Sequence, residues 1–568
     1  MSYKIGKVIG VENGALTISL FDHDTDDDGI EFGVHENMTI DLPSESGPQP
    51  LLIGQPGSFI EVSLPVGRLL CTVISIKMSE ESATGSDVKN LDLGYFAVLS
   101  KQRIITALPI GTFGSDGRFE RGTDVLPTVG TFAYAVSPEK IRTVYRTASE
   151  REFSVGVLSI LPDERAYIDI DTFIGRHGAI LGQTGGGKSW TVASILQKIQ
   201  QFSKATVILL DLHGEYKNAF GSDAEYLSAA DIELPYWLMN FEELVGLCID
   251  RGEREAPNQI AKFRELLQNA KEEAAQNEKL NLPKITLDTP IYFSFEDVIN
   301  SLRQIDTAME QGSRGLRQGP FFGQFTRMLT RVESKLNDKR YDLIFKPRKY
   351  VSSKSLSDLM RKLLGEEETP KKTVILDISP IPFDVRASVI SLLLRVAFDF
   401  AYWHRRAFEK EYPIYVVCDE AHIYLNDKDI SQTPARLAAE RIAKEGRKYG
   451  VGLLVTSQRP RELSATILSQ CNTFVCMRVS NPDDQSYIKG LLPDSLRGIV
   501  DVFATLRRGE ALFLGESVMM PTRIRIDPPN PTPNSNDIKF SKIWNEPHEE
   551  IDFDYVLDEW RRQGVPRT

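Results

Sequence analysis

The octapeptide from Gly182 to Ser189, GQTGGGKS, constrains the fold of this chain more than any other segment. It matches the pattern G-x-x-x-x-G-K-[ST], whose glycines let backbone N–H groups turn inward around an anion. The apolar segment HGAIL precedes it, and WTVASILQKIQ, which has helical periodicity, follows it. A strand, a glycine-rich loop and a helix in this order predict a phosphate-binding loop in an α/β fold with parallel strands.

The loop also predicts a nucleotide and a metal ion. We expect Lys188 to neutralise the β- and γ-phosphates of ATP and Ser189 to bind Mg²⁺. The other residues expected around the nucleotide are Gly182, Gln183, Thr184, Gly185, Gly186, Gly187 and Trp190.

Three further strand ends carry polar residues suited to the same chemistry. The segment IYVVCDE predicts that Asp419 holds Mg²⁺ and that Glu420 polarises the attacking water. In DLHGEY, Asp211 and Glu215 could reach the metal and water shell, although a tight turn with satisfied polar groups is a serious alternative. Gln458, after GLLVTS, is expected to sense the γ-phosphate, with a plain strand-end amide as the alternative.

The rest of the chain divides into segments with different patterns of apolar and polar residues. Residues 1–155 read as short strands separated by turn residues, which suggests a small antiparallel barrel or sandwich. Residues 156–222 and 366–526 alternate apolar strands with helices. Residues 223–365 form a polar, helix-friendly insertion that contains the amphipathic segment NQIAKFRELLQNAKEEAAQNEKL. Residues 527–568 begin with a Pro/Asn-rich linker and end in a short segment that looks like a docking helix.

Composition limits the class of protein. The chain has 568 residues and a net charge of −12, which argues against one broad basic face but allows DNA to be held in a narrow channel. Five scattered cysteines favour reduced thiols in a cytoplasmic protein, and no apolar run is long enough to predict a membrane helix. The acidic loop DHDTDDDG matches only half of a calcium-binding pattern and favours a solvated turn.

Basic residues gather in the second half of the insertion. A solvated helical face is the favoured interpretation, with contact to DNA or a partner as the alternative. The residues are Arg331, Lys335, Lys339, Arg340, Lys346, Arg348, Lys349 and Lys354.

Six segments in order resemble the HerA family of hexameric DNA-pumping ATPases, which are relatives of the FtsK translocases. They are RHGAILGQTGGGKS, DLHGEY, VVCDEAH, EGRKYGVGLLVTSQRP, RVSNPDDQSYI and GEALFLGESV, spread between Val157 and Ile526. One departure is Gly186, where the family usually has Ser. The resemblance implies a RecA-like P-loop NTPase core and an N-terminal β-barrel. The insertion and the tail match no motif of the family, and we expect the tail to brace a ring.

The resemblance also assigns two arginines and several partners. Arg176 matches the family's cis sensing arginine, and Arg447 matches its arginine finger, which enters the site of the neighbouring subunit. For each, the alternative is a surface or salt-bridge arginine. Arg441 and Lys448 stand near Arg447 in the sequence. The implied function is a homo-hexamer that pumps double-stranded DNA beside an effector, such as a NurA-type nuclease or a sirtuin-type NAD hydrolase, in DNA end processing or antiphage defence.

Other classes fit less well. The letters DEAH at 419–422 invite a DEAH-box helicase, but no second lobe with its arginine-rich motif follows. An AAA+ remodelling ATPase lacks an evident helical lid. A ring scaffold that uses ATP as a switch to regulate an effector stays open as the alternative to a motor.

Overall fold

The computed structural model describes residues 3–26, 29–42, 49–81, 100–148, 153–228, 232–312, 315–381, 383–429, 432–535, 539–545 and 551–562. Two compact units make up the chain. The first comprises residues 1–194, 457–461 and 471–528, and the second comprises residues 195–456, 462–470 and 529–568.

A closed β-barrel opens the first unit. Six strands pair around it in the order β9-β2-β1-β11-β7-β8, and β8 pairs with β9 to close the circle. Buried and partly exposed residues alternate along β2, as expected where one face of a strand points into a core. The barrel prediction is thereby confirmed. The strands are β1 (Lys4–Glu12), β2 (Ala15–Leu20), β7 (Phe59–Ser63), β8 (Arg68–Glu81), β9 (Ser100–Phe113) and β11 (Phe132–Ala135).

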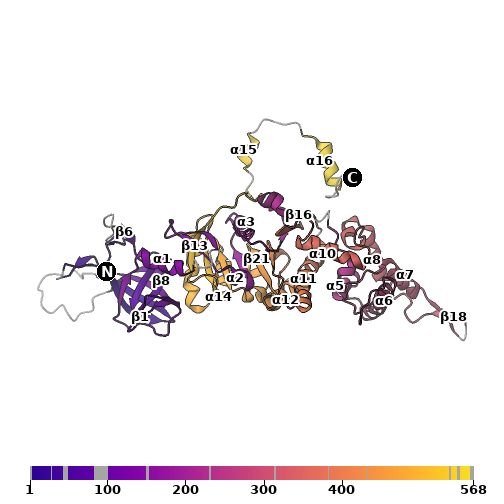
Figure 1. Cartoon of the computed structure of the whole chain (residues 1–568), viewed down its shortest axis with the longest axis horizontal. Coiled ribbons are helices and arrows are strands. Elements are labelled where there is room, and N and C mark those ends of the chain that lie inside the picture. Colours follow the sequence, from indigo (N-terminus) through magenta and orange to yellow (C-terminus); the bar gives the residue numbers. More distant parts are fainter. Residues whose placement is uncertain are drawn as a thin grey trace. The chain divides into compact units, whose positions relative to one another are not determined.

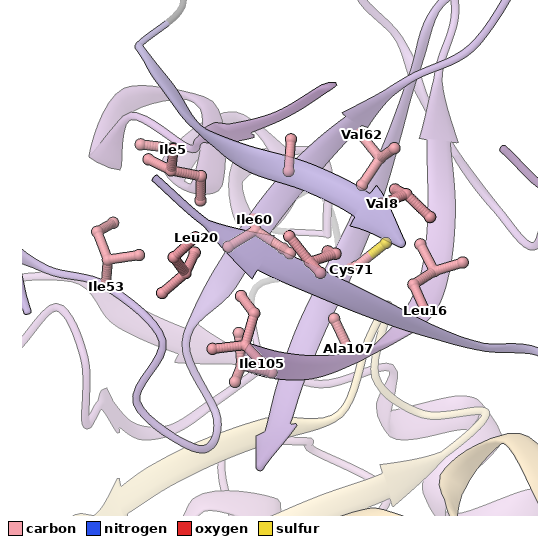
Figure 2. Packing of buried hydrophobic residues seen from close by; sticks show 14 of the residues in the cluster. Ile5, Val8, Leu16, Leu20, Ile53, Ile60, Val62, Cys71, Ile105 and Ala107 are labelled. Carbon is pink, nitrogen blue, oxygen red and sulfur yellow. The ribbon is translucent and has the colours of Figure 1, made fainter. Parts of the chain in front are cut away.

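Branched aliphatic side chains fill the barrel. Figure 2 shows side chains from three strands packed inside the barrel: Ile5 and Val8 of β1, Ile60 and Val62 of β7, and Ile105 of β9. All five are fully buried. β-Branched residues suit such positions because they pack well on a pleated surface and lose little rotamer freedom there.

The acidic loop forms a short hairpin beside these strands. β3 (Asp24–Thr25) pairs with β4 (Glu31–Phe32), and the side chain of Asp26 accepts a hydrogen bond from the N–H of Ile30. The described residues Asp24 and Asp26 are exposed, as expected for a solvated turn. Asp28 lies outside the described residues.

A mixed sheet follows the barrel in the first unit, with strand order β13-β12-β24-β23-β22-β14. β14 and β22 are parallel, while the remaining neighbours are antiparallel. The strands are β12 (Ser154–Leu158), β13 (Arg165–Tyr167), β14 (Gly178–Leu181), β22 (Thr473–Cys476), β23 (Glu510–Gly515) and β24 (Thr522–Ile526).

Five parallel strands form the sheet of the second unit, in the order β21-β20-β15-β19-β16. Every residue of β15, β19, β20 and β21 is buried, which explains why these strands read as continuous apolar runs. The sequence predicts six core strands, in HGAIL, ATVILLDL, TVILDIS, IYVVCDE, VGLLVTS and NTFVCMRV. All six are present: four in this sheet, and two, β14 and β22, in the first unit. The strands of this unit are β15 (Val207–Asp211), β16 (Ala224–Ser228), β19 (Thr373–Asp377), β20 (Ile414–Cys418) and β21 (Val451–Ser457).

Two helices connect these parallel strands. α11 (Phe383–Phe408) and α12 (Thr433–Tyr449) precede β20 and β21, respectively. α12 ends at Gly450, which has a left-handed φ of 80° and allows the chain to turn directly into β21.

Helices also dominate the insertion, and Figure 1 shows α5, α6, α7 and α8 gathered in one group. The expected amphipathic helix is α6, which buries Phe263, Leu267 and Ala275 along one side. The insertion is not wholly helical, because β16 pairs with β19 and β17 (Met309–Gly312) pairs with β18 (Gly315–Gln318). The helices are α5 (Phe241–Cys248), α6 (Ala256–Asn277), α7 (Phe295–Asp306), α8 (Thr326–Asn337), α9 (Asp342–Phe345) and α10 (Leu356–Leu364).

The C-terminal tail carries two short helices, α15 (Phe540–Trp544) and α16 (Phe553–Arg562). Large apolar side chains on both are exposed, including Trp544 at 79% and Trp560 at 70%. Among the described residues, no helix has the length and apolar character needed to cross a membrane.

Replacing Ile105 with Ala should destabilise the barrel by about 2–5 kcal/mol, because a fully buried branched side chain leaves a cavity. Hydrogen exchange of the β8 and β9 amides should then accelerate by at least roughly 30-fold. Ile9→Ala is the matched control, since Ile9 is 43% exposed on β1, another strand of the same barrel. Equal exchange rates in the two variants would contradict the assigned core.

Candidate functional site

The phosphate loop lies in the first unit, between β14 and α3 (Lys188–Ile199). Gly185 and Gly187 have φ angles of 75° and 103°, in the region that favours glycine. Gly182 is required for a different reason, since a Cβ there would lie 2.8 Å from the Cβ of Met477. The glycines therefore permit both the turn of the loop and its close approach to the chain after β22.

Hydrogen bonds from neighbouring segments fix the loop. The N–H of Gln183 donates to the carbonyl of Arg478 at 2.9 Å, and the hydroxyl of Ser480 donates to the Gln183 side chain. The hydroxyl of Thr184 donates to Oε1 of Gln458. The structure thus brings Gln458 to the loop, where a residue that senses a phosphate is expected. Arg478 and Ser480 had no assigned role, although both belong to the motif RVSNPDDQSYI.

Lys188 begins α3 and its side chain is buried, with 6% exposed. The first N–H groups of a helix have no intrahelical acceptors, so this end of α3 is suited to an anion. Gly186 is the departure from the family pattern. A Cβ at that position would lie 3.0 Å from the carbonyl oxygen of Gln183, so a serine would require only a small local shift. The indole N–H of Trp190 is buried and has no acceptor among the described residues.

Three carboxylates end adjacent strands of the second unit. Asp211 ends β15, Asp377 ends β19, and Asp419 follows β20. Asp211 lies opposite Asp377 in the parallel register, and Leu210 lies opposite Cys418. Because all three strands are parallel, the three carboxylates share one edge of the sheet. Asp377 was missed, although TVILDIS carries the same signal as the strand before Asp211.

The carboxylate of Asp211 holds the turn that follows it. Its oxygens accept hydrogen bonds from four backbone N–H groups at 2.9 to 3.3 Å, which belong to His213, Gly214, Glu215 and Tyr216. Burial raises the pKa of Asp211 above its usual value, while these N–H groups lower it. The tight-turn interpretation therefore accounts for Asp211. Glu215 lies on the same turn and is only partly buried.

Asp419 is buried and accepts a 2.6 Å hydrogen bond from the hydroxyl of Thr456. Burial raises the pKa of Asp419 to about 7; the hydrogen bond opposes this, and the nearby carboxylates Glu420, Asp211 and Glu215 reinforce it. Near neutral pH this carboxyl group is therefore poised between its protonated and ionised forms. A bound cation favours the ionised form, so cation binding here would release a proton.

Glu420 has a left-handed backbone, with φ of 44°. Such a conformation costs about 1–3 kcal/mol in a residue other than glycine and is concentrated at functional sites. Thr456 holds it in place, because its Oγ1 accepts a 3.0 Å hydrogen bond from the Glu420 N–H. The Glu420 carboxylate also lies 3.3 Å from Nδ1 of His422. Neither Thr456 nor His422 was assigned a role from the sequence.

A Mg²⁺ ion needs few protein ligands at such a site, because substrate phosphates and water supply the others. No group of three or more His, Cys, Asp or Glu side chains within the described part of the chain is arranged to hold a metal ion alone. Ser189 in the first unit and Asp419 in the second each offer an oxygen atom, the kind of ligand that Mg²⁺ prefers.

The candidate arginines differ in what they contact. Arg176 ends α2 (Ile170–Gly175) and forms an ion pair with Glu516, which is the alternative that the sequence left open. Arg441 pairs with Asp399 at 3.3 Å and lies over the Phe398 ring at 4.2 Å.

Arg447 is exposed on α12 and has no ion pair or hydrogen bond within the described ranges. It lines an open depression of about 650 Å³ together with Arg405 and Lys448. Of the two candidate arginines on α12, Arg447 is therefore the one available to another molecule.

Comparisons with known proteins find similarity to a protein family and to solved structures. The family described as "Helicase HerA, central domain" matches residues 154–397. The "DNA double-strand break repair helicase HerA" of Pyrococcus furiosus is 27% identical over 430 residues, covering 70% of this chain and 73% of that protein. The protein of the same name from Sulfolobus acidocaldarius is 27% identical over 454 residues, covering 78% and 82%. Among solved structures, VirB4 of Thermoanaerobacter pseudethanolicus is similar with a TM-score of 0.45 and 16% identity, covering 66% of this chain and 96% of that chain.

Replacing Asp211 with Ala should lower the midpoint of thermal unfolding by on the order of 5 °C, because four N–H groups lose their acceptor. Intrinsic tryptophan fluorescence, to which the fully buried Trp237 of the same unit contributes, can follow the transition. The control is Glu215→Ala on the same turn, which should unfold near the wild-type temperature. A larger loss in the Glu215 variant than in the Asp211 variant would reverse the roles of these two carboxylates.

Proposed function

This chain belongs to the HerA family of helicases, and we propose that it drives double-stranded DNA through a ring of six identical subunits. It is an ATP-hydrolysing DNA helicase or translocase. The observation that carries the finer proposal is the phosphate loop, whose glycine conformations and bound Gln458 suit it to the terminal phosphates of ATP.

The residues take the following roles in the proposed reaction. Lys188 neutralises the β- and γ-phosphates, while Ser189 and Asp419 supply oxygen to Mg²⁺, which would offset the charge of the phosphates. Glu420 accepts a hydrogen bond from the attacking water and polarises it. Gln458 reports whether the γ-phosphate is present. Among the carboxylates of DLHGEY, Glu215 is the one we assign to the water shell, since Asp211 is occupied by its turn.

A ring follows from the need for a transition-state cation. An arginine supplied by a neighbouring subunit contributes about 10³–10⁵ in rate to P-loop hydrolysis. Arg447 suits this role because it is exposed beside Arg405 and Lys448, and Arg441 suits it less because Asp399 and Phe398 hold it. Closed symmetry then presents the same finger at every site. Arg176, paired with Glu516, would respond to nucleotide from within its own subunit.

The tail and the effector complete the proposal. α15 and α16 expose aromatic and aliphatic side chains that would be covered if the tail braced a neighbouring subunit of the ring. The motor would act in the cytoplasm with an effector such as a NurA-type nuclease or a sirtuin-type NAD hydrolase, in DNA end processing or antiphage defence.

Replacing Lys188 with Ala should abolish ATP hydrolysis, because the phosphates lose their direct counter-charge. Phosphate release is measured with and without duplex DNA, and Lys204→Ala, which removes an exposed lysine of the loop after α3, is the control. The wild type and the control should be stimulated by DNA. ATP hydrolysis that is indifferent to DNA would favour the scaffold over the motor, and hydrolysis by the Lys188 variant would refute the site.

Mixing two inactive variants tests both the finger and the ring. Arg447→Ala should lower kcat far more than it weakens ATP binding, because a finger acts in the transition state. Glu420→Gln should bind ATP without hydrolysing it. In a mixed ring, the finger of a Glu420→Gln subunit can serve the intact site of an Arg447→Ala neighbour, so part of the activity should return.

Arg441→Ala is the matched control, since it removes an arginine from the same helix and should retain activity. Native mass spectrometry establishes that mixed rings have formed. Mixed rings without recovered hydrolysis would show that Arg447 does not act in trans.

A further inference from the structure

A cleft of about 560 Å³ lies on the insertion of the second unit, apart from the motifs described above. α8 forms one wall of this cleft, and the segment after the helix forms another. Four cationic side chains line it: Arg327, Arg331, Lys335 and Arg340.

The cations of α8 form a row. Arg327, Arg331 and Lys335 are spaced four residues apart, so they share one face of the helix at intervals of about 6 Å. Thr330 and Ser334 also line the cleft beside this row. Like charges at this spacing destabilise a helix, so the row needs counter-charges from the protein or from a ligand.

The protein supplies counter-charges to only some of the four cations. Glu253 and Asp250 pair with Arg331 at 2.8 and 3.5 Å, and Asp338 pairs with Arg340 at 2.6 Å. Arg327 is exposed and has no ion pair or hydrogen bond among the residues that the structure describes. The four cations of the lining face two lining carboxylates, Glu253 and Asp338, and Asp250 beside them, which leaves an excess of one positive charge.

The side chains that line the cleft point to phosphate as the group that fits. Arginine forks and Ser or Thr hydroxyls are the side chains that commonly contact phosphate oxygens. An exposed solvated face, the interpretation that the sequence favoured, would not account for a cleft of this volume.

The aromatic residue of the cleft does not offer a surface for bases. Tyr341 is buried, with 4% exposed. Nζ of Lys335 lies over its ring at 4.5 Å and donates to its hydroxyl at 3.1 Å. Base recognition in single strands relies on open aromatic faces, which this cleft lacks among its described lining residues.

We propose that this cleft binds the phosphodiester backbone of duplex DNA and does so without reading its sequence. The proposal rests on the proposed function in one respect, that DNA is the substrate. It adds a contact site on the insertion, separate from the phosphate loop and from Arg447.

Arg327 is the residue to change, because its removal breaks no contact seen in the described part of the fold. Binding of the full-length protein to a fluorescent blunt duplex is measured by anisotropy from about 50 to 200 mM salt. Arg327→Ala should weaken binding equally for duplexes of different sequence and reduce the slope of log K against log salt by about 1. Arg327→Glu should weaken it further. Arg361→Ala, an exposed arginine of α10 that does not line the cleft, should keep the wild-type slope.

A chemical cross-link locates the contact directly. All five native cysteines are buried, so Thr330→Cys places a selectively reactive thiol in the cleft. A duplex with a thiol-reactive group on one backbone phosphate should cross-link to this variant, and excess unmodified duplex should prevent it. Ser357→Cys on α10, another exposed hydroxyl position of the insertion, should react much less.

The outcomes separate this inference from the proposed motor. One outcome would refute DNA binding by the cleft and leave the proposed motor intact. In that outcome, DNA stimulates ATP hydrolysis by the wild type, but the Arg327 variants keep the wild-type salt slope and Thr330→Cys forms no cross-link. Absence of any DNA binding by the wild type would overturn the motor and the cleft together. A third outcome is that polyglutamate prevents the cross-linking of Thr330→Cys as effectively as unmodified duplex does. That result would identify a site for acidic peptides and refute the phosphate assignment.

Discussion

The parallel register of β15, β19 and β20 is the constraint on which the chemistry of the second unit depends. It places the ends of three buried strands side by side, so Asp211, Asp377 and Asp419 must share one edge. Buried carboxylates repel one another and lose hydration, and the chain meets that cost with specific donors. Four N–H groups satisfy Asp211, Ser379 and Tyr226 donate to Asp377, and Thr456 donates to Asp419.

The three carboxylates do not receive equal numbers of hydrogen bonds, and this difference separates the structural carboxylate Asp211 from the reactive carboxylate Asp419. Asp211 has its oxygens engaged by a turn, whereas the carboxylate of Asp419 accepts from the hydroxyl of Thr456, and burial raises its pKa to about 7. The free energy needed to remove the proton from such a group at neutral pH is small, because neither form is strongly preferred. A cation can therefore replace the proton. The left-handed Glu420 next to it adds a strained backbone that Thr456 anchors.

Much of this was predictable from the sequence, for physical reasons. Fully buried parallel strands must be continuous apolar runs, so all six core strands were identified, and the phosphate loop is fixed by glycines that the backbone requires. Contacts between distant segments were not predictable. The letters of DLHGEY do not reveal that Asp211 binds four N–H groups, and β16 became a strand only through its pairing with β19. Arg441 and Arg447 look alike in sequence, and the contacts of Arg441 with Asp399 and Phe398 on α11 distinguish them.

The acidic net charge of the chain makes local cation clusters the decisive electrostatic feature. With a net charge of −12, long-range attraction to DNA is weak, and salt screens charges beyond about 10 Å. Contacts with phosphate must therefore form at short range, where cations outnumber neighbouring carboxylates. The depression around Arg447 and the cleft along α8 both meet that condition, yet they differ in shape and in the groups beside the cations. A single exposed finger suits one reacting phosphate, whereas a row repeated every turn of a helix, flanked by hydroxyls, suits a polymer of phosphates. The distribution of charge thus argues for two separate tasks performed with the same kind of side chain.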